Sequence, residues 1–231
     1  MMRCLALFLF FQWAVPARVS AEPGQKRASE DPVVQEALDR LDNESLSESS
    51  RLTAAKDLKR LDRSRDKEAA VASVVDFFED HRRERNSNPS KRDAEYAADR
   101  VELMEILGAL AADTASRAAG ESRRAPAEVS ECLNALIGAL QDKDEPWAAR
   151  RKAAEMLAQF AGTAPAAALA DTRRVLEVAS TQIGEVVDNE LTAKSWLSSH
   201  HPDRSIVEGH RGALKSVLTA LGPLTPPAQA P

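Results

Sequence analysis

An arginine lies seven residues before a leucine at four places in the chain, and this recurrence restricts the possible folds most strongly. A small or apolar residue lies four positions before each leucine, and an apolar residue lies three positions after it. Such positions share one face of an α-helix. The sequence therefore predicts four related helices, whose leucines are 49, 50 and 61 residues apart. The four pairs are Arg51 with Leu58, Arg100 with Leu107, Arg150 with Leu157, and Arg211 with Leu218.

Each of these helices follows another segment with helical apolar spacing. Ala accounts for 41 of the 231 residues and aromatic residues for 4%, a composition that favours helix over sheet. One helix pair cannot bury its apolar face alone, so recurring pairs are expected to stack. The predicted pairs are Val33–Leu41 with Glu48–Leu61, Glu68–Phe78 with Asp93–Leu110, Val129–Leu140 with Pro146–Phe160, and Thr172–Val187 with Ser205–Leu221. The second and fourth pairs contain insertions.

Residues 136–157, LIGALQDKDEPWAARRKAAEML, resemble the HEAT-repeat family. They combine an apolar first helix, a turn containing Asp144, Arg150 six residues later and an Ala-Ala-x-x-Leu second helix. The resemblance implies an all-α fold, a short right-handed α-solenoid of about four helix pairs. It also implies that the Asp and Arg residues have a structural role and join neighbouring repeats. In this chain these residues are Arg51, Arg100, Asp144, Arg150 and Arg211.

The first 21 residues have the pattern of a secretory signal. Met1-Met2-Arg3 is positively charged, Cys4 to Val15 is apolar, and Val19-Ser20-Ala21 offers small residues before a cut. We predict cleavage after Ala21 and export to a bacterial periplasm or to the medium. The alternative is an uncleaved membrane anchor, but about a dozen apolar residues are few for crossing a bilayer.

The rest of the chain divides into one domain and two short ends. Residues 22–31 are polar and residues 223–231 are rich in Pro, so both are predicted to be disordered. No further apolar run is long enough to predict an integral membrane segment after signal cleavage. The predicted helical domain covers 32–222, with pairs at about 32–62, 66–112, 127–162 and 170–222.

The charge balance argues against a dedicated nucleic-acid binder. The chain has 36 acidic and 31 basic residues, for a net charge of −5. Basic residues cluster at 81–85, 91–92 and 123–124, but acidic residues interrupt them and aromatic residues are not interleaved. Solvated loops are therefore the preferred interpretation of these clusters.

Few residues suggest chemistry, and no cofactor is predicted. The sequence lacks a Gly-rich phosphate loop, a zinc-protease motif and a nucleophile elbow. Weak candidates for a metal site are His200, His201, Asp203 and His210, although a locally packed insertion that merely contains histidines explains them better.

Cys132 is the only thiol that would remain after signal cleavage. It lies at the edge of an apolar stripe, which favours a buried small hydrophobic residue. The alternative is an intermolecular disulfide in an oxidising compartment.

These features predict a monomeric exported scaffold that binds a protein or peptide through its concave face, without catalysis of its own. The alternative is an enzyme or an enzyme accessory subunit, with a metal in the 200–210 insertion. Candidate partner-binding residues are the solvent-facing positions of the second helices, whose charge is mixed: Lys56, Arg60, Glu102, Glu105, Lys152, Glu155 and Gln159.

Overall fold

The computed structural model describes residues 29–62, 65, 67–87, 93–192 and 204–221. These residues form eight α-helices and no strand, which confirms the all-helical prediction. Every predicted helix is present. The helices are α1 (Pro32–Leu41), α2 (Glu48–Arg60), α3 (Glu68–Ser87), α4 (Asp93–Gly120), α5 (Ala127–Gln141), α6 (Trp147–Thr163), α7 (Ala166–Thr192) and α8 (Arg204–Leu221).

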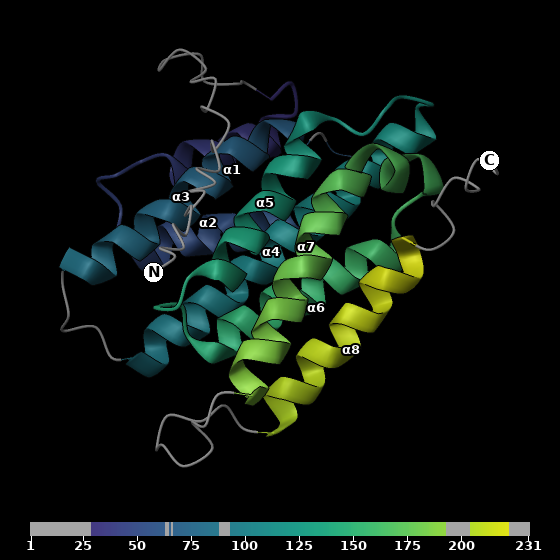
Figure 1. The fold of residues 1–231 in the computed structure, drawn as a ribbon. Helices are drawn as coiled ribbons and strands as arrows, with labels where there is room; N and C mark the ends of the chain where they lie inside the picture. Colours follow the sequence, from purple (N-terminus) through teal and green to yellow (C-terminus); the bar gives the residue numbers. More distant parts are fainter. Residues whose placement is uncertain (1–28, 63–64, 66, 88–92, 193–203, 222–231) are drawn as a thin grey trace, which may run out of the picture.

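The helices are arranged in two layers (Figure 1). Helices α1, α3, α5 and α7 contact one another in that order and form the first layer. Helices α2, α4, α6 and α8 contact one another in the same way and form the second layer. Each first-layer helix also packs on the second-layer helix that follows it in the chain. The second layer presents the positions that were predicted to face a partner.

Polar caps and prolines mark where helices begin. Asp31 accepts a hydrogen bond from the backbone N–H of Val33 at 2.9 Å, and Pro32 is the first residue of α1. Ser47 caps α2 through the N–H of Ser50. These contacts satisfy N–H groups that have no partner within the helix, and Pro lacks the N–H altogether. The two helix starts are therefore local properties of the sequence.

Three helices are longer than their apolar spacing predicts. Helix α3 continues to Ser87, α4 continues to Gly120, and α7 begins at Ala166. The added turns of α4 bury alanines, since Ala111, Ala115 and Ala118 are fully buried. Alanine favours helix strongly but contributes little to an apolar stripe. The continuation of α3 to Ser87 and of α7 to Thr192 makes part of each expected insertion helical.

The C-terminus of α4 bends into α5 through a left-handed residue. Ser122 has φ of 56°. The N–H of Arg123 donates to the carbonyl of Ala118 at 2.8 Å, and the N–H of Ser122 donates to the carbonyl of Ala119 at 3.1 Å. This pair of hydrogen bonds is a Schellman motif, in which Gly is the usual left-handed residue. The serine at this position is a local source of backbone strain.

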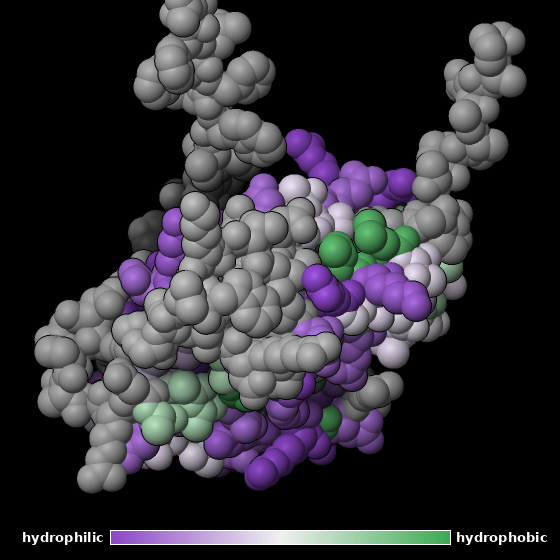
Figure 2. All heavy atoms as spheres, turned by 60° about the horizontal axis from the view of Figure 1, so that its bottom comes forward, coloured by the Kyte–Doolittle hydropathy of each residue, from purple (hydrophilic) through white to green (hydrophobic). Residues whose placement is uncertain are grey.

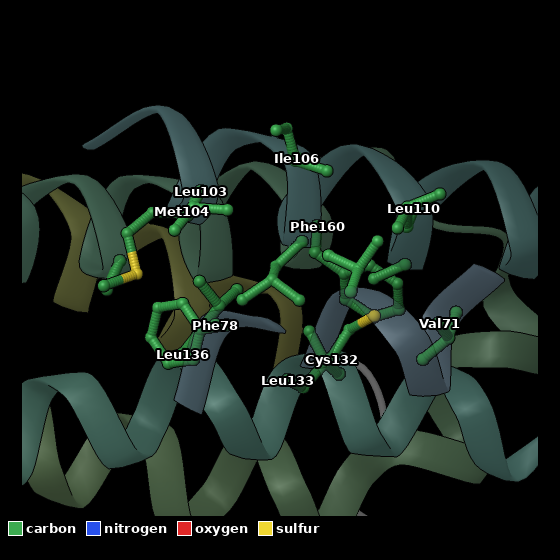
Figure 3. Close-up of a cluster of buried hydrophobic side chains, with 14 of the residues drawn as sticks. Val71, Phe78, Leu103, Met104, Ile106, Leu110, Cys132, Leu133, Leu136 and Phe160 are labelled. Carbon is green, nitrogen blue, oxygen red and sulfur yellow. The ribbon is translucent and has the colours of Figure 1, made fainter. Parts of the chain in front are cut away.

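The core lies between the two layers (Figure 3). Phe78 of α3, Leu103 of α4, Leu136 of α5 and Phe160 of α6 meet there, and each is at most 2% exposed. Cys132 of α5 is fully buried among them. Burial of this mainly apolar surface is the main source of stability for stacked helices.

Candidate functional site

Three arginines of the recurring column are buried and bind the preceding first-layer helix. Arg51 Nε donates to the Leu41 carbonyl at 2.8 Å. Arg150 donates to the Leu140 carbonyl through Nε at 3.2 Å and Nη2 at 3.0 Å. Both carbonyls lie at helix C-termini, where the helix itself provides no donor. These two arginines therefore hold together the helices of their own pair.

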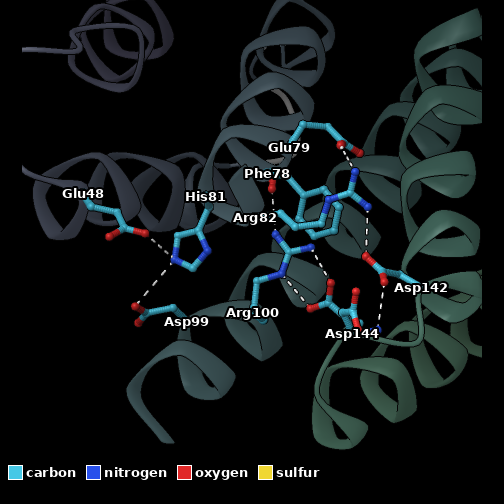
Figure 4. A network of polar contacts seen from close by, with 10 residues as sticks. Glu48, Phe78, Glu79, His81, Arg82, Asp99, Arg100, Asp142 and Asp144 are labelled. Atoms are coloured by element: carbon cyan, nitrogen blue, oxygen red, sulfur yellow. Dashed lines mark hydrogen bonds and ion pairs between the residues drawn. The ribbon is translucent and has the colours of Figure 1, made fainter. Parts of the chain in front are cut away.

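Arg100 forms the most buried polar contact of the column (Figure 4). It donates to the Phe78 carbonyl at 2.7 Å, and two further bonds of 2.7 and 2.9 Å reach the two carboxylate oxygens of Glu145. The side chains of Arg100 and Glu145 are 0% and 1% exposed. The guanidinium also lies 3.6 Å from the centre of the Phe78 ring. Glu145 precedes α6, so this ion pair connects successive helix pairs.

The sequence pattern predicted the structural role for Asp144 rather than for Glu145. Asp144 is exposed, and its backbone N–H donates to the Asp142 side chain. The chain turns at residues 142–145, so the neighbouring carboxylates of Asp144 and Glu145 face different sides. Only Glu145 points into the core. A buried glutamate in a short turn is not distinguishable from an exposed neighbour by residue type alone.

The register assigned to the fourth pair is wrong by one residue. Leu58, Leu107 and Leu157 are fully buried, but Leu218 is 51% exposed. The buried face of α8 carries His210, Ala213 and Val217 instead. His210 therefore takes the place that arginine has in the other three pairs, and Arg211 is exposed. The error arose because α8 has apolar residues on two faces, so spacing alone admitted either alignment.

Five of the seven predicted partner-binding positions, together with Lys59, which was not predicted, form a ladder of ion pairs across the second layer. Lys59 Nζ lies 2.7 Å from Glu105 and 3.9 Å from Glu102, and Lys56 lies 4.0 Å from Glu102. Lys152 lies 3.0 Å from Glu105. The ladder thus joins α2, α4 and α6. We refer to these five residues, together with Glu155, which lies 3.2 Å from Lys152, as the charged ladder.

Contacts within the charged ladder shift the pKa values of Glu105 and Lys152. Hydrogen bonds from Lys59 and Lys152 lower the pKa of Glu105, although partial burial acts in the opposite direction. Burial tends to lower the pKa of Lys152, but the hydrogen bonds that it donates to Glu105 and Glu155 raise it. Glu105 therefore stays ionised further into acid, and its charge is largely compensated by the two lysines.

A hollow of about 380 Å³ lies beside the ladder between α4 and α6. The charged residues that line it, Lys59, Glu105, Asp113 and Lys152, form its polar rim. The two helices approach closely at Gly108, where an added Cβ would lie 2.8 Å from the Met156 Cβ. The remaining lining is mostly small or apolar and includes Ala109, Ala112, Met156, Gln159 and Phe160. Arg60 lies outside this hollow, at the exposed end of α2.

A second polar group ties α2, α3 and α4 together (Figure 4). His81 is buried, with Nε2 at 2.7 Å from Glu48 and 3.7 Å from Asp99, and its ring stacks on Tyr96. Arg82, which the sequence analysis placed in a solvated loop, belongs to α3. It donates to Asp142 at 2.9 Å. This basic cluster therefore begins as part of the packed fold.

No group of three or more His, Cys, Asp or Glu residues suited to a metal is present within the described ranges. His200, His201 and Asp203 lie outside the described residues, and His210 is buried in α8. Cys132 is fully enclosed, and burial raises the pKa of its thiol. None of the helices in the described part of the chain is long and apolar enough to span a membrane.

Comparison of the chain with protein-family models, with curated proteins and with solved structures finds no match.

Proposed function

We propose that this chain is an exported HEAT-like α-solenoid that binds a protein or peptide partner through the surface of its second layer, without catalysis of its own. The hollow between α4 and α6 carries the proposal, since it combines an apolar floor with a rim of both charge signs. Binding sites commonly pair an apolar surface with a few placed polar groups.

The order of helix contacts supports a solenoid. Each pair contacts the next through both layers, so that α1, α3, α5 and α7 follow one another, as do α2, α4, α6 and α8. Nearest-neighbour stacking of this kind produces an extended surface along one layer, which repeat proteins use for binding.

The charged ladder favours a protein or peptide over a nucleic acid. Its lysines lie beside Glu102, Glu105 and Glu155, so the surface has no continuous positive track. A polyanion requires such a track. A partner with its own mixed charges can exchange ion pairs with the rim and thereby set its register.

A peptide-display selection against the purified protein tests this proposal. Ala109→Trp fills the hollow from its edge, and Ala170→Trp on the exposed face of α7 is the matched control. Peptides enriched on the wild type should bind Ala170→Trp equally and Ala109→Trp at least about tenfold more weakly, because the apolar floor is blocked. Absence of an enriched peptide family, or full binding by Ala109→Trp, would refute the proposal.

Charge reversal provides a second measurement with the same peptides. Changing Lys56 and Arg60 to Glu should weaken binding of the peptides and make their affinity less dependent on salt concentration. Arg174→Glu is a suitable control because Arg174 is exposed on α7. Arg82 is unsuitable because its bond to Asp142 contributes to the packing of α3.

Export is tested by the mass of the protein released by the producing cell. We expect a mature chain that begins at Glu22. A membrane-bound product that retains Met1 would identify an anchor instead.

A further inference from the structure

We propose that the exposed face of α8 docks an acidic amphipathic helix of a partner protein. The face consists of Arg211, Leu214, Lys215 and Leu218, which we call the α8 patch. It lies at the end of the second layer and is separate from the hollow between α4 and α6. The inference therefore holds whether or not that hollow binds a ligand.

The α8 patch is an apolar surface where the stack of helices ends. Its members follow the i, i+3, i+4, i+7 spacing of one helix face. Leu218 is 51% exposed and Leu214 is partly buried against the core, while the adjacent face of α8 packs through Ala213 and Val217. Figure 2 shows a green patch bordered by white and purple residues on the side of the molecule that carries α8 in Figure 1. Terminal repeats are normally polar on this outer side.

The two cations of the α8 patch are uncompensated. Within the described part of the chain, neither Arg211 nor Lys215 forms an ion pair or a side-chain hydrogen bond. Lys59 and Lys152 of the same layer are both paired with Glu105. The α8 patch therefore carries positive charge that no neighbouring carboxylate among the described residues neutralises, and a carboxylate of a partner would complement it.

The shape of the α8 patch suits a helix. Its residues line a shallow hollow of about 400 Å³ with two leucines one turn apart. An amphipathic helix inserts anchors at i, i+3 or i+4, and i+7 into such a groove. Carboxylates that flank these anchors would lie against Arg211 and Lys215. This contact continues the packing that each second-layer helix makes with the next.

Other occupants fit less well. Attachment to an anionic membrane generally uses four to eight clustered basic residues, whereas the α8 patch has two. A symmetric contact between two copies of α8 would place the same cations against each other. An acidic helix satisfies both the leucines and the charges.

The experiment uses a labelled helical peptide of about sixteen residues with leucines at this spacing and flanking glutamates. Its twin carries lysines in place of the glutamates. We expect saturable binding of the acidic peptide by fluorescence anisotropy and none of the twin. The protein has a net charge of −5, so general attraction does not explain such a preference. No saturable binding of the acidic peptide, or equal binding of the twin, would overturn the inference.

Variants locate the contact. The double variant Arg211→Glu, Lys215→Glu should bind the acidic peptide at least about tenfold more weakly and should now bind the basic twin. Leu218→Ser should weaken binding of the acidic peptide, and Arg174→Glu should leave it unchanged. Circular dichroism verifies that each variant is folded. Unchanged binding by the double variant refutes the assignment. The assignment is also refuted if the protein adsorbs to vesicles of anionic phospholipid and the double variant loses this adsorption but still binds the acidic peptide.

Discussion

Replacement of Arg100 by methionine should be the most destabilising single change in the arginine column. The guanidinium makes two bonds to Glu145 and one to the Phe78 carbonyl, and both charged side chains are at most 1% exposed. Methionine fills much of the same volume but leaves the carboxylate buried without a cation. Breaking a buried ion pair by removing one partner costs about 3–5 kcal/mol. For a domain of this size, that loss lowers Tm by about 6–20 °C.

The other members of the column provide an internal scale. Arg150→Met removes the donors of one buried carbonyl, that of Leu140, and should cost about 1–3 kcal/mol. Arg211 is exposed, so Arg211→Met should change stability by less than about 0.5 kcal/mol. The double variant Arg100→Met, Glu145→Leu removes both charges and should recover most of the stability lost by Arg100→Met.

Urea denaturation followed by far-UV circular dichroism measures all four variants. If the free energy of unfolding falls with urea concentration at the same slope in every variant, the folded and unfolded states remain comparable. A loss below about 1 kcal/mol for Arg100→Met would refute the reasoning. An equal loss for Arg211→Met would refute it as well, because exposure would then not determine the cost.

Three further outcomes are expected. Ser122→Gly should raise stability by about 0.5–1 kcal/mol in the same assay, since it relieves a positive φ; a lower midpoint would contradict this. In a Cys4→Ser protein, Cys132 should react with a thiol reagent only as fast as the chain unfolds, because it is fully buried; rapid reaction of the folded protein would contradict it. Lysine bonds lower the pKa of Glu105 below 4.5, so this carboxylate stabilises the fold above that pH and the effect disappears as the pH falls through the lower folded value. Glu105→Gln should therefore lose about 1 kcal/mol or less at neutral pH and show a shallower acid dependence, which stability curves between pH 3 and 7 measure; an unchanged curve would exclude the bonds with Lys59 and Lys152.

Helix positions and the buried faces of α2, α4 and α6 were accessible from the sequence because they depend on local spacing. Apolar residues at helical intervals predicted all eight helices, and Leu58, Leu107 and Leu157 are buried as the register requires. Helix ends were less accessible where the buried face consists of alanine, as in the last turns of α4. Alanine is common on both buried and exposed helix surfaces, so its spacing does not distinguish them.

The tertiary structure alone decided which polar groups meet. Glu145 rather than Asp144 turns inward to Arg100, and the lysines of α2 and α6 neutralise the glutamates of α4. Contacts of this kind join residues about 45 positions apart in the chain. Their partners depend on the rotation and separation of packed helices. Periodicity predicts which face of a helix is buried, but the angle at which two helices pack depends on the side chains of both. The same rotation placed Leu218 at the surface of α8 and Val217 in the core.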